Sequence, residues 1–195
     1  MIPIALDPRC VRLAVCGNGR LALRRFTALQ AAGATDLLLF ADDPLPALQA
    51  AAGEHWRPRL PDTGDLACLH GLWIVDLEAA KAEPLADQAR ARHLLVNIED
   101  VPAFCDFHSV AEIRRGDLLL TISTGGAAPG LAGLIRRRLE SMFDGRWAER
   151  LVELRALRAT WRAQGVPMAE AMRRIETLVA DRGWLDAPEK LTREK

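Results

Sequence analysis

The chain has 195 residues, half of them hydrophobic, and its 26 basic and 26 acidic side chains leave no net charge. This length suits one ordinary domain with a smaller one, and the neutral balance argues against nucleic acid or an anionic membrane surface as a partner. No run approaches the ~18 apolar residues of a membrane-spanning helix, and the first residues lack the features of a signal peptide. We therefore expect a cytoplasmic protein that binds neither membranes nor nucleic acid.

The cysteines and histidines do not indicate a metal site. No two cysteines form a CxxC pair, their spacing fits no zinc module, and no histidines pair at metal-ligand spacing. Cys16 lies in an apolar run and is expected to be a buried small hydrophobe. We expect no resident metal and a reducing compartment.

The first part of the chain alternates between short apolar runs and helical patterns. Strands are predicted at 11–16, 37–40, 72–75 and 94–97, with a weaker one at 56–60, and helices at 20–32, 46–52 and 84–92. This order predicts an α/β fold, a mostly parallel sheet with helices on its faces.

The character of the sequence changes after this region. A strand is predicted at 117–123, followed by a Gly-Gly pair and then by helices at 131–143, 147–165 and 168–182. Arginines 136–138 are interpreted as a solvated helix face rather than a binding patch. The second part of the chain is therefore expected to be mainly helical.

A glycine-rich loop joins the first predicted strand to the first helix. Residues 17–22 read Gly-Asn-Gly-Arg-Leu-Ala, which matches the dinucleotide-binding pattern G-x-G-x-x-A in its proper context. Gly17 permits the tight turn, Gly19 lets the backbone approach a pyrophosphate, and Ala22 lets helix and strand pack closely. The helix N-terminus supplies N–H groups for the phosphates. The predicted cofactor-binding residues of this loop are Gly17, Asn18, Gly19, Arg20 and Leu21.

Two aspartates follow the second predicted strand at the distance where this motif places its ribose-binding carboxylate. Asp42 and Asp43 are the candidates. A carboxylate there would repel a 2′-phosphate, which favours NAD over NADP. The alternative interpretation of the loop is a tight strand-to-helix turn without a ligand.

Several linked motifs further along the chain resemble a known family. Residues 97–107 read NIEDVPAFCDF, residues 114–116 read RRG, and residues 121–129 read TISTGGAAP. Together with the segment 17–25, GNGRLALRR, they resemble the precorrin-2 dehydrogenases of siroheme synthesis. That family includes enzymes that are also ferrochelatases and the N-terminal module of multifunctional siroheme synthases. The resemblance runs from about residue 3 to about residue 160.

The resemblance implies a particular architecture and activity. It implies a Rossmann-like NAD-binding domain at 1–112, a small dimerisation region at 113–145 and a helical C-terminal domain at 146–195. It also implies a homodimer that oxidises precorrin-2 to sirohydrochlorin with NAD, in the siroheme or cobalamin pathway. If the chain is also a chelatase, Fe²⁺ or Co²⁺ is a second substrate.

The family's catalytic aspartate corresponds to Asp100. This residue follows a predicted strand at the carboxyl edge of the sheet, where open α/β folds bind ligands. A carboxylate there could serve as the base that removes a proton during oxidation, and it could accept the pyrrole protons that metal insertion releases. The residues alone favour a turn-forming aspartate before Pro102, and the resemblance favours catalysis.

Four further residues are candidates for contact with the substrate's carboxylates. His108 follows the family segment, and the alternative for it is an ordinary polar residue. Ser123, Thr124 and Gly125 lie at the Gly-Gly turn, where the hydroxyls either bind substrate or stabilise the turn.

The sequence departs from the family at four places. Asn18 replaces the middle glycine of a GGG loop, and Asp76-Leu77-Glu78 replaces a T-D-D sequence after a strand. Ala128 replaces a serine, and Val110 replaces a proline. These changes leave two alternatives open: a chelatase that has lost the dehydrogenase activity, and a non-catalytic dimer that binds a tetrapyrrole or a nucleotide.

Overall fold

A computed structural model describes residues 2–186, which divide into two compact units, one ending at Ser109 and the other beginning at Val110. Each unit is described by itself. The residues 187–195, the end of the predicted helical C-terminal domain, lie outside the described range.

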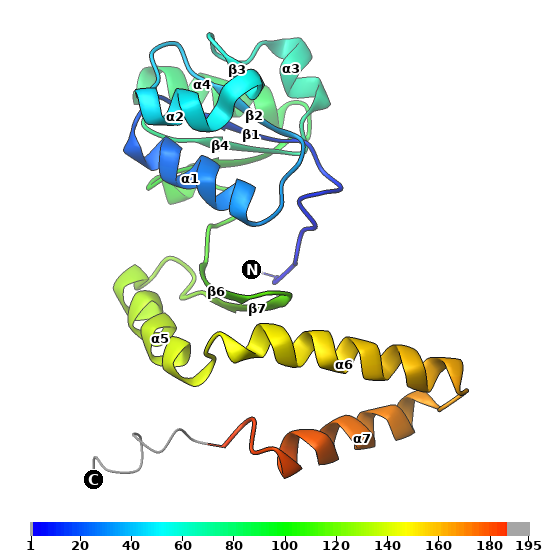
Figure 1. The fold of residues 1–195 in the computed structure, drawn as a ribbon. Helices are drawn as coiled ribbons and strands as arrows, with labels where there is room; N and C mark the ends of the chain where they lie inside the picture. The colour runs from blue at the N-terminus through cyan, green and yellow to red at the C-terminus, as the bar shows by residue number, and fades with distance from the viewer. Residues whose placement is uncertain (1, 187–195) are drawn as a thin grey trace. The chain divides into compact units, whose positions relative to one another are not determined.

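The first unit is built on a five-stranded parallel sheet in the order β3-β2-β1-β4-β5 (Figure 1). Its strands are β1 (Leu13–Cys16), β2 (Leu37–Phe40), β3 (Trp56–Arg57), β4 (Gly71–Ile74) and β5 (Leu95–Ile98). The predicted α/β fold with a parallel sheet is therefore confirmed. The weak strand expected at 56–60 is shorter, because only two of its residues pair with β2.

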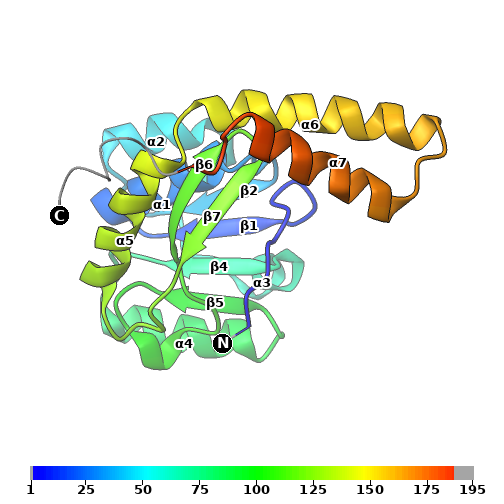
Figure 2. The same cartoon turned by 90° about the horizontal axis from the view of Figure 1, so that it is seen from below.

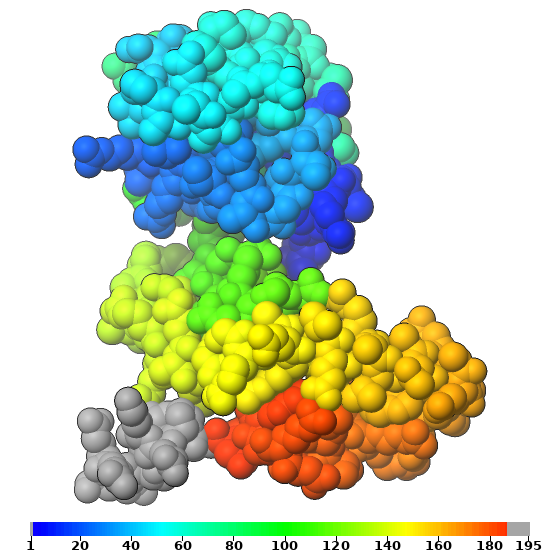
Figure 3. Space-filling view, in the orientation of Figure 1, coloured from blue at the N-terminus to red at the C-terminus, as the bar shows by residue number. Residues whose placement is uncertain are grey.

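Helices cover both faces of this sheet. They are α1 (Arg20–Ala31), α2 (Pro46–Ala52), α3 (Thr63–Cys68) and α4 (Ala79–Arg90), with short 3₁₀ turns at Gly53–His55 and Pro102–Phe104. Alternate side chains of each strand point to opposite faces. Leu13 and Val15 therefore pack in one buried cluster with α1 and α2, while Ala14 and Cys16 pack in the other with α3 and α4. In the space-filling view the atoms of α1 and α2 hide the sheet (Figure 3, blue and cyan).

The strand register places the loops that follow β1, β2, β4 and β5 at one edge of the sheet. Cys16 of β1 is level with Phe40 of β2 and Ile74 of β4, and Ile74 is level with Ile98 of β5. Each of these is the last residue of its strand, and the strands are parallel. The loops that begin at residues 17, 41, 75 and 99 therefore leave the sheet at the same carboxyl edge.

One α-helix and one strand were not predicted from the sequence, and α4 begins well before its expected start. The short helix α3 is fixed by a capping box in which Asp62 accepts from the backbone N–H of Asp65 and the Asp65 carboxylate accepts from the N–H of Asp62. Helix α4 begins at Ala79 rather than at the expected Pro84, which lies inside it. Strand β6, the second missing element, belongs to the other unit.

Between Val110 and residue 186, the second unit combines a two-stranded sheet with three helices. Strand β6 (Ala111–Arg115) pairs antiparallel with β7 (Leu118–Ile122), and α5 (Pro129–Met142), α6 (Arg146–Ala163) and α7 (Met168–Asp181) follow. The apolar strand expected at 117–123 therefore has a partner, the adjacent β6. Figures 1 and 2 show α6 and α7 lying side by side.

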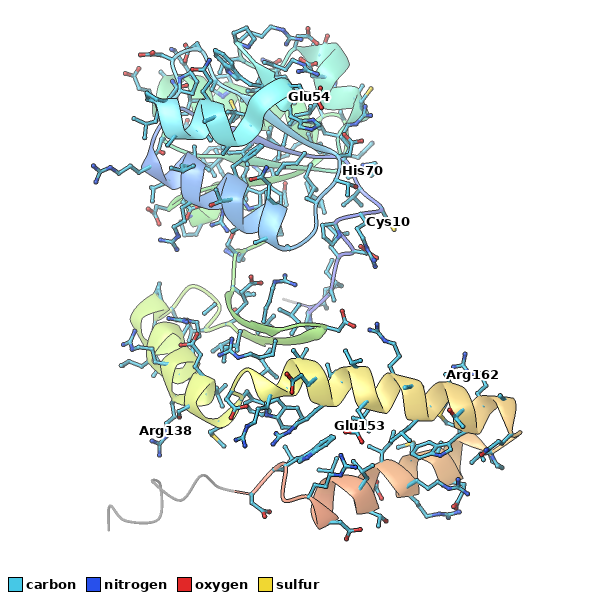
Figure 4. The ribbon with its side chains drawn as sticks, in the orientation of Figure 1. Cys10, Glu54, His70, Arg138, Glu153 and Arg162 are labelled. Carbon is cyan, nitrogen blue, oxygen red and sulfur yellow. The ribbon has the colours of Figure 1, made fainter. Side chains whose placement is uncertain are left out.

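The two long helices are joined at one end by an arginine held between tryptophans. The guanidinium of Arg150 lies 4.8 Å from the ring centre of Trp147 and 5.0 Å from that of Trp184. Arg182 also donates to Glu153, at 2.7 Å, and Glu153 lies between α6 and α7 in Figure 4. These contacts anchor the chain after α7 to the start of α6. No helix within residues 2–186 is long and apolar enough to cross a membrane.

Candidate functional site

Gly17 is the residue that the glycine loop requires most strictly. Its φ is +152°, and a Cβ built on it would lie 1.7 Å from the carbonyl oxygen of Val75. The backbone that follows β4 therefore lies directly against the backbone that follows β1. No side chain fits between them, so the sequence interpretation of Gly17 as a tight-turn residue has a direct steric cause.

Asn18 ties the glycine loop to the loop after β2. Its Nδ2 donates to Asp42 Oδ1 at 2.7 Å, and its Oδ1 accepts from the backbone N–H of Asp43 at 3.3 Å. Its carbonyl oxygen accepts from the N–H of Leu45 at 2.9 Å. The hydrogen bond from Asn18 lowers the pKa of Asp42, so this exposed carboxyl stays ionised. The residue that departs from the family's glycine thus orients the aspartate expected to bind the ribose.

Gly19 and the first turn of α1 contact a carboxylate that was not among the site residues predicted from the sequence. Asp76 follows β4, and its Oδ2 accepts from the backbone N–H of Ala22 at 3.0 Å. A Cβ at Gly19 would lie 2.5 Å from the same oxygen. Arg20 and Leu21 begin the helix with exposed side chains. The only signal for Asp76 in the sequence was its departure from the family at this position.

Asp100 lies in a turn directly after β5, at the same edge. Its side chain is exposed and its φ is +64°, a left-handed conformation that aspartate tolerates better than most residues. The turn is held on both sides, since Glu99 N donates to Ile74 O and Val101 N donates to Ile98 O. This geometry matches the interpretation of Asp100 as a turn-forming residue. It also leaves the carboxylate exposed to solvent at the carboxyl edge of the sheet, where open α/β folds bind ligands.

A partly buried ion pair links this turn to the helix of the glycine loop. Arg25 of α1 donates through Nη2 to both carboxylate oxygens of Glu99, at 2.8 and 3.1 Å. The two side chains are only 17% and 21% exposed. A small pocket of about 100 Å³ is lined by Glu99 and Val101 together with Asp76 and Leu77. The residues on either side of Asp100 therefore share a pocket with the carboxylate that caps α1.

The segment that carries His108 is anchored to the sheet. The buried Asn97 of β5 donates to the carbonyl oxygen of Phe107 at 2.8 Å. The ring of Phe107 packs edge-on against Trp73, with ring centres 4.8 Å apart. His108 itself is half-buried. Its position as a substrate contact stays a prediction.

Ser123, Thr124 and Gly125 lie in the second unit, in the turn that leads from β7 to α5. Ser123 Oγ accepts from the N–H of Gly125 and Thr124 Oγ1 accepts from the N–H of Ala128, each at 3.2 Å. Gly125 has a φ of +65°, which favours glycine there. Both hydroxyls therefore stabilise the turn, as one of the two sequence interpretations expected. Each retains donor capacity for a ligand.

Other polar groups gather at the opposite edge of the sheet. Cys10 and His70 lie there (Figure 4), with His70 Nδ1 accepting from the N–H of Arg12. Cys16 is fully buried as expected, and burial raises its pKa to about 12. Within residues 2–186, no group of three or more His, Cys, Asp or Glu side chains could hold a metal ion.

The carboxyl edge fits a dinucleotide on structural grounds. Gly19 adds no side chain of its own at the start of α1, where the first N–H groups of a helix have no partners within the helix. An ionised carboxylate, Asp42, follows β2 at the place where ribose hydroxyls are bound in this fold. A five-stranded parallel sheet in this strand order, with a glycine loop and this acidic residue, defines a dinucleotide-binding Rossmann domain.

Comparisons with known proteins give the family. Residues 4–111 match the model of an NAD(P)-binding family, and residues 115–142 match the central region of sirohaem biosynthesis proteins. A siroheme synthase from Thiobacillus denitrificans is 37% identical over 149 residues, which cover 73% of this chain and 30% of that protein. Siroheme synthase 1 from Pectobacterium atrosepticum is 35% identical over 147 residues, with the same coverage. This chain therefore spans about a third of the length of these relatives.

One solved structure covers almost the whole chain. The protein described as SirC, precorrin-2 dehydrogenase, matches 95% of this chain and 93% of its own, with a TM-score of 0.74 and 20% sequence identity. This likeness shows that the two share a fold. The family models and the siroheme synthases show that the chain belongs to the family of NAD(P)-binding sirohaem biosynthesis proteins. The resemblance read from the sequence motifs is thus confirmed.

Proposed function

We propose that this chain oxidises precorrin-2 to sirohydrochlorin, with NAD as the hydride acceptor. The observation that carries the proposal is the placement of the glycine loop and Asp100 at one edge of one sheet, set by the register of β1, β4 and β5. NAD supplies the acceptor for a hydride, and the second hydrogen of the substrate leaves as a proton. Asp100 is the residue proposed to take that proton.

The proposed site would use the remaining residues for binding. Residues 17–21 of the glycine loop bind the pyrophosphate, and Asp42 and Asp43 lie beside the adenosine ribose. His108, Ser123, Thr124 and Gly125 are proposed contacts for the carboxylates of the tetrapyrrole. The test is anaerobic incubation of the purified chain with precorrin-2 and NAD. Sirohydrochlorin formed only when both are present supports the proposal, and no conversion at any NAD concentration refutes it.

The preference for NAD over NADP is expected to depend on Asn18. Asn18→Ala removes the hydrogen bond that lowers the pKa of Asp42 and frees its side chain to turn away. We expect the affinity for NAD to fall about threefold to tenfold, which is the effect of one lost hydrogen bond. The ratio of the affinity for NAD to that for NADP should also become smaller. Titration calorimetry with both dinucleotides measures this.

The matched control is Gln30→Ala, which removes a side-chain amide bonded to Ala51 O, away from the Asp42 carboxylate. It should leave both affinities unchanged. If Asn18→Ala also leaves the ratio of the two affinities unchanged, the hydrogen bond from Asn18 to Asp42 does not set the cofactor preference.

We further propose that the chain is a homodimer that pairs through its second unit. Within the described residues, β6 and β7 form a sheet of only two strands, and such a pair is marginal alone and has unpaired edges. Large apolar side chains are exposed on α5 nearby in sequence, including Leu131, Leu134 and Ile135. Light scattering at micromolar concentration should give twice the mass of one chain, and a monomer would contradict the proposal.

A chelatase without dehydrogenase activity is the second candidate function. It is favoured by Asp76, whose carboxylate lies where the phosphates of the dinucleotide would bind. Asp100 would then accept the protons that the pyrrole nitrogens release when Fe²⁺ or Co²⁺ enters sirohydrochlorin. Insertion of either metal into supplied sirohydrochlorin, measured without NAD, separates this candidate from a protein that only binds its ligand.

A further inference from the structure

Asp76 occupies the position that an anionic ligand of the glycine loop would take. Helix α1 has Gly19 as its N-cap, which offers no side chain, and no acidic residue lies in its first turn. The acceptor at this helix end comes instead from the loop after β4, through the bond from Ala22 N to Asp76 Oδ2 at 3.0 Å. A negative charge is favoured here by the unpaired N–H groups and the positive end of the helix dipole.

The contact is maintained at a conformational cost. Asp76 has a φ of +53°, one of three residues other than glycine with positive φ within residues 2–186. Its Cβ, Cγ and Oδ2 all lie within 3.1 Å of the place where a Cβ at Gly19 would be. The side chain thus fills the space that the missing Cβ of Gly19 creates, which is the space proposed for the pyrophosphate.

We propose that Asp76 is an internal competitor of the dinucleotide. Its carboxylate and a phosphate need the same N–H group and the same volume above Gly19, and their like charges repel each other. The dinucleotide therefore binds only when Asp76 turns away, so this residue sets the affinity for the cofactor. The proposal rests on the dinucleotide site of the proposed function.

Displacement of Asp76 would also affect the surroundings of the turn that holds Asp100, the proposed base. Asp76 and Leu77 line the same small pocket as Glu99 and Val101, the neighbours of Asp100. When the carboxylate leaves α1, the lining of the pocket changes. Binding of the cofactor is in this way coupled to the shape of the space beside Asp100.

The test compares Asp76→Asn and Asp76→Gly with the unaltered chain. Asparagine removes the charge at nearly constant shape, and glycine removes the whole side chain while suiting the φ of +53°. NAD affinity, measured by calorimetry, is expected to rise about tenfold or more in both variants. Glu83→Gln removes a charge from the rim of the same pocket without touching α1, and it should change the affinity less than about twofold.

Thermal unfolding without ligand gives a second measurement. Asp76→Asn should melt at a lower temperature than the unaltered chain, because α1 loses its charged cap, while the rise in melting temperature on adding NAD becomes larger. A purely structural Asp76 would lower the melting temperature and leave NAD affinity the same or weaker, which overturns the proposal. If that result is obtained while the unaltered chain still binds NAD, the proposal for Asp76 fails but the proposed function does not. If neither the unaltered chain nor any folded Asp76 variant binds NAD, both fail.

Discussion

Asp100→Asn is expected to slow the oxidation of precorrin-2 by at least about 100-fold, because a general base typically contributes about 10²–10⁴-fold. The structure makes asparagine the appropriate replacement. Asp100 has a φ of +64°, which asparagine tolerates and alanine does not, so alanine would mix strain with the loss of the base. NAD affinity should stay near that of the unaltered chain. Single-turnover rates with saturating NAD measure the effect.

Two controls separate the loss of a base from a disturbed turn. Asp100→Gly suits the same φ and lacks a carboxylate, so it should be as slow as Asp100→Asn. Asp106→Asn alters a nearby carboxylate that binds Arg90 and the N–H of Val96, and should retain most of the rate if it remains folded. A near-native rate in Asp100→Asn would make Asp100 a turn residue and leave the reaction without a base.

Gly17→Ala is expected to destabilise the fold by about 3 kcal/mol or more. The new Cβ would lie 1.7 Å from Val75 O, between two backbone segments that are both fixed by strands. The N–H of Gly17 donates to Phe40 O and that of Val75 donates to Cys16 O, so neither segment can move without breaking the sheet edge. Urea unfolding, followed by tryptophan fluorescence, gives the loss in free energy of unfolding.

Gly33→Ala is the matched control for this glycine. Gly33 also has a positive φ, +96°, but nothing lies within 4 Å of the Cβ it would gain. Its replacement should cost about 1 kcal/mol, from backbone strain alone. If Gly17→Ala loses no more stability than Gly33→Ala, the close approach of the two backbones is not what requires glycine.

The parts of the fold that the sequence predicted are those set by local pattern. The strand at 37–40 and the helix at 46–52 have the predicted bounds, because one is a continuous apolar run and the other has proline at its start. Strand β6 was missed because it has a single buried residue, Ile113, and is a strand only through pairing with β7. Its own pattern is polar.

The candidate site likewise contains residues that a local pattern predicts and residues that depend on contacts between distant segments. The glycine loop and Asp42 could be predicted as candidates because their spacing follows from one strand, one turn and one helix. The contact of Asp76 with α1 depends on the register of β4 beside β1, which no local pattern records. The role of Asn18 likewise requires the loop after β2 to lie beside it. Contacts between loops that follow different strands can be identified only when the order and register of the strands are known.

The stoichiometry of the reaction tests the central claim most directly. Precorrin-2 and NAD are mixed with the chain without oxygen, and NADH and sirohydrochlorin are measured in the same sample over time. The account predicts that one NADH forms for each sirohydrochlorin, with both rates falling together in Asp100→Asn. Sirohydrochlorin that appears without NADH, or no product from a chain that binds both ligands, would contradict it.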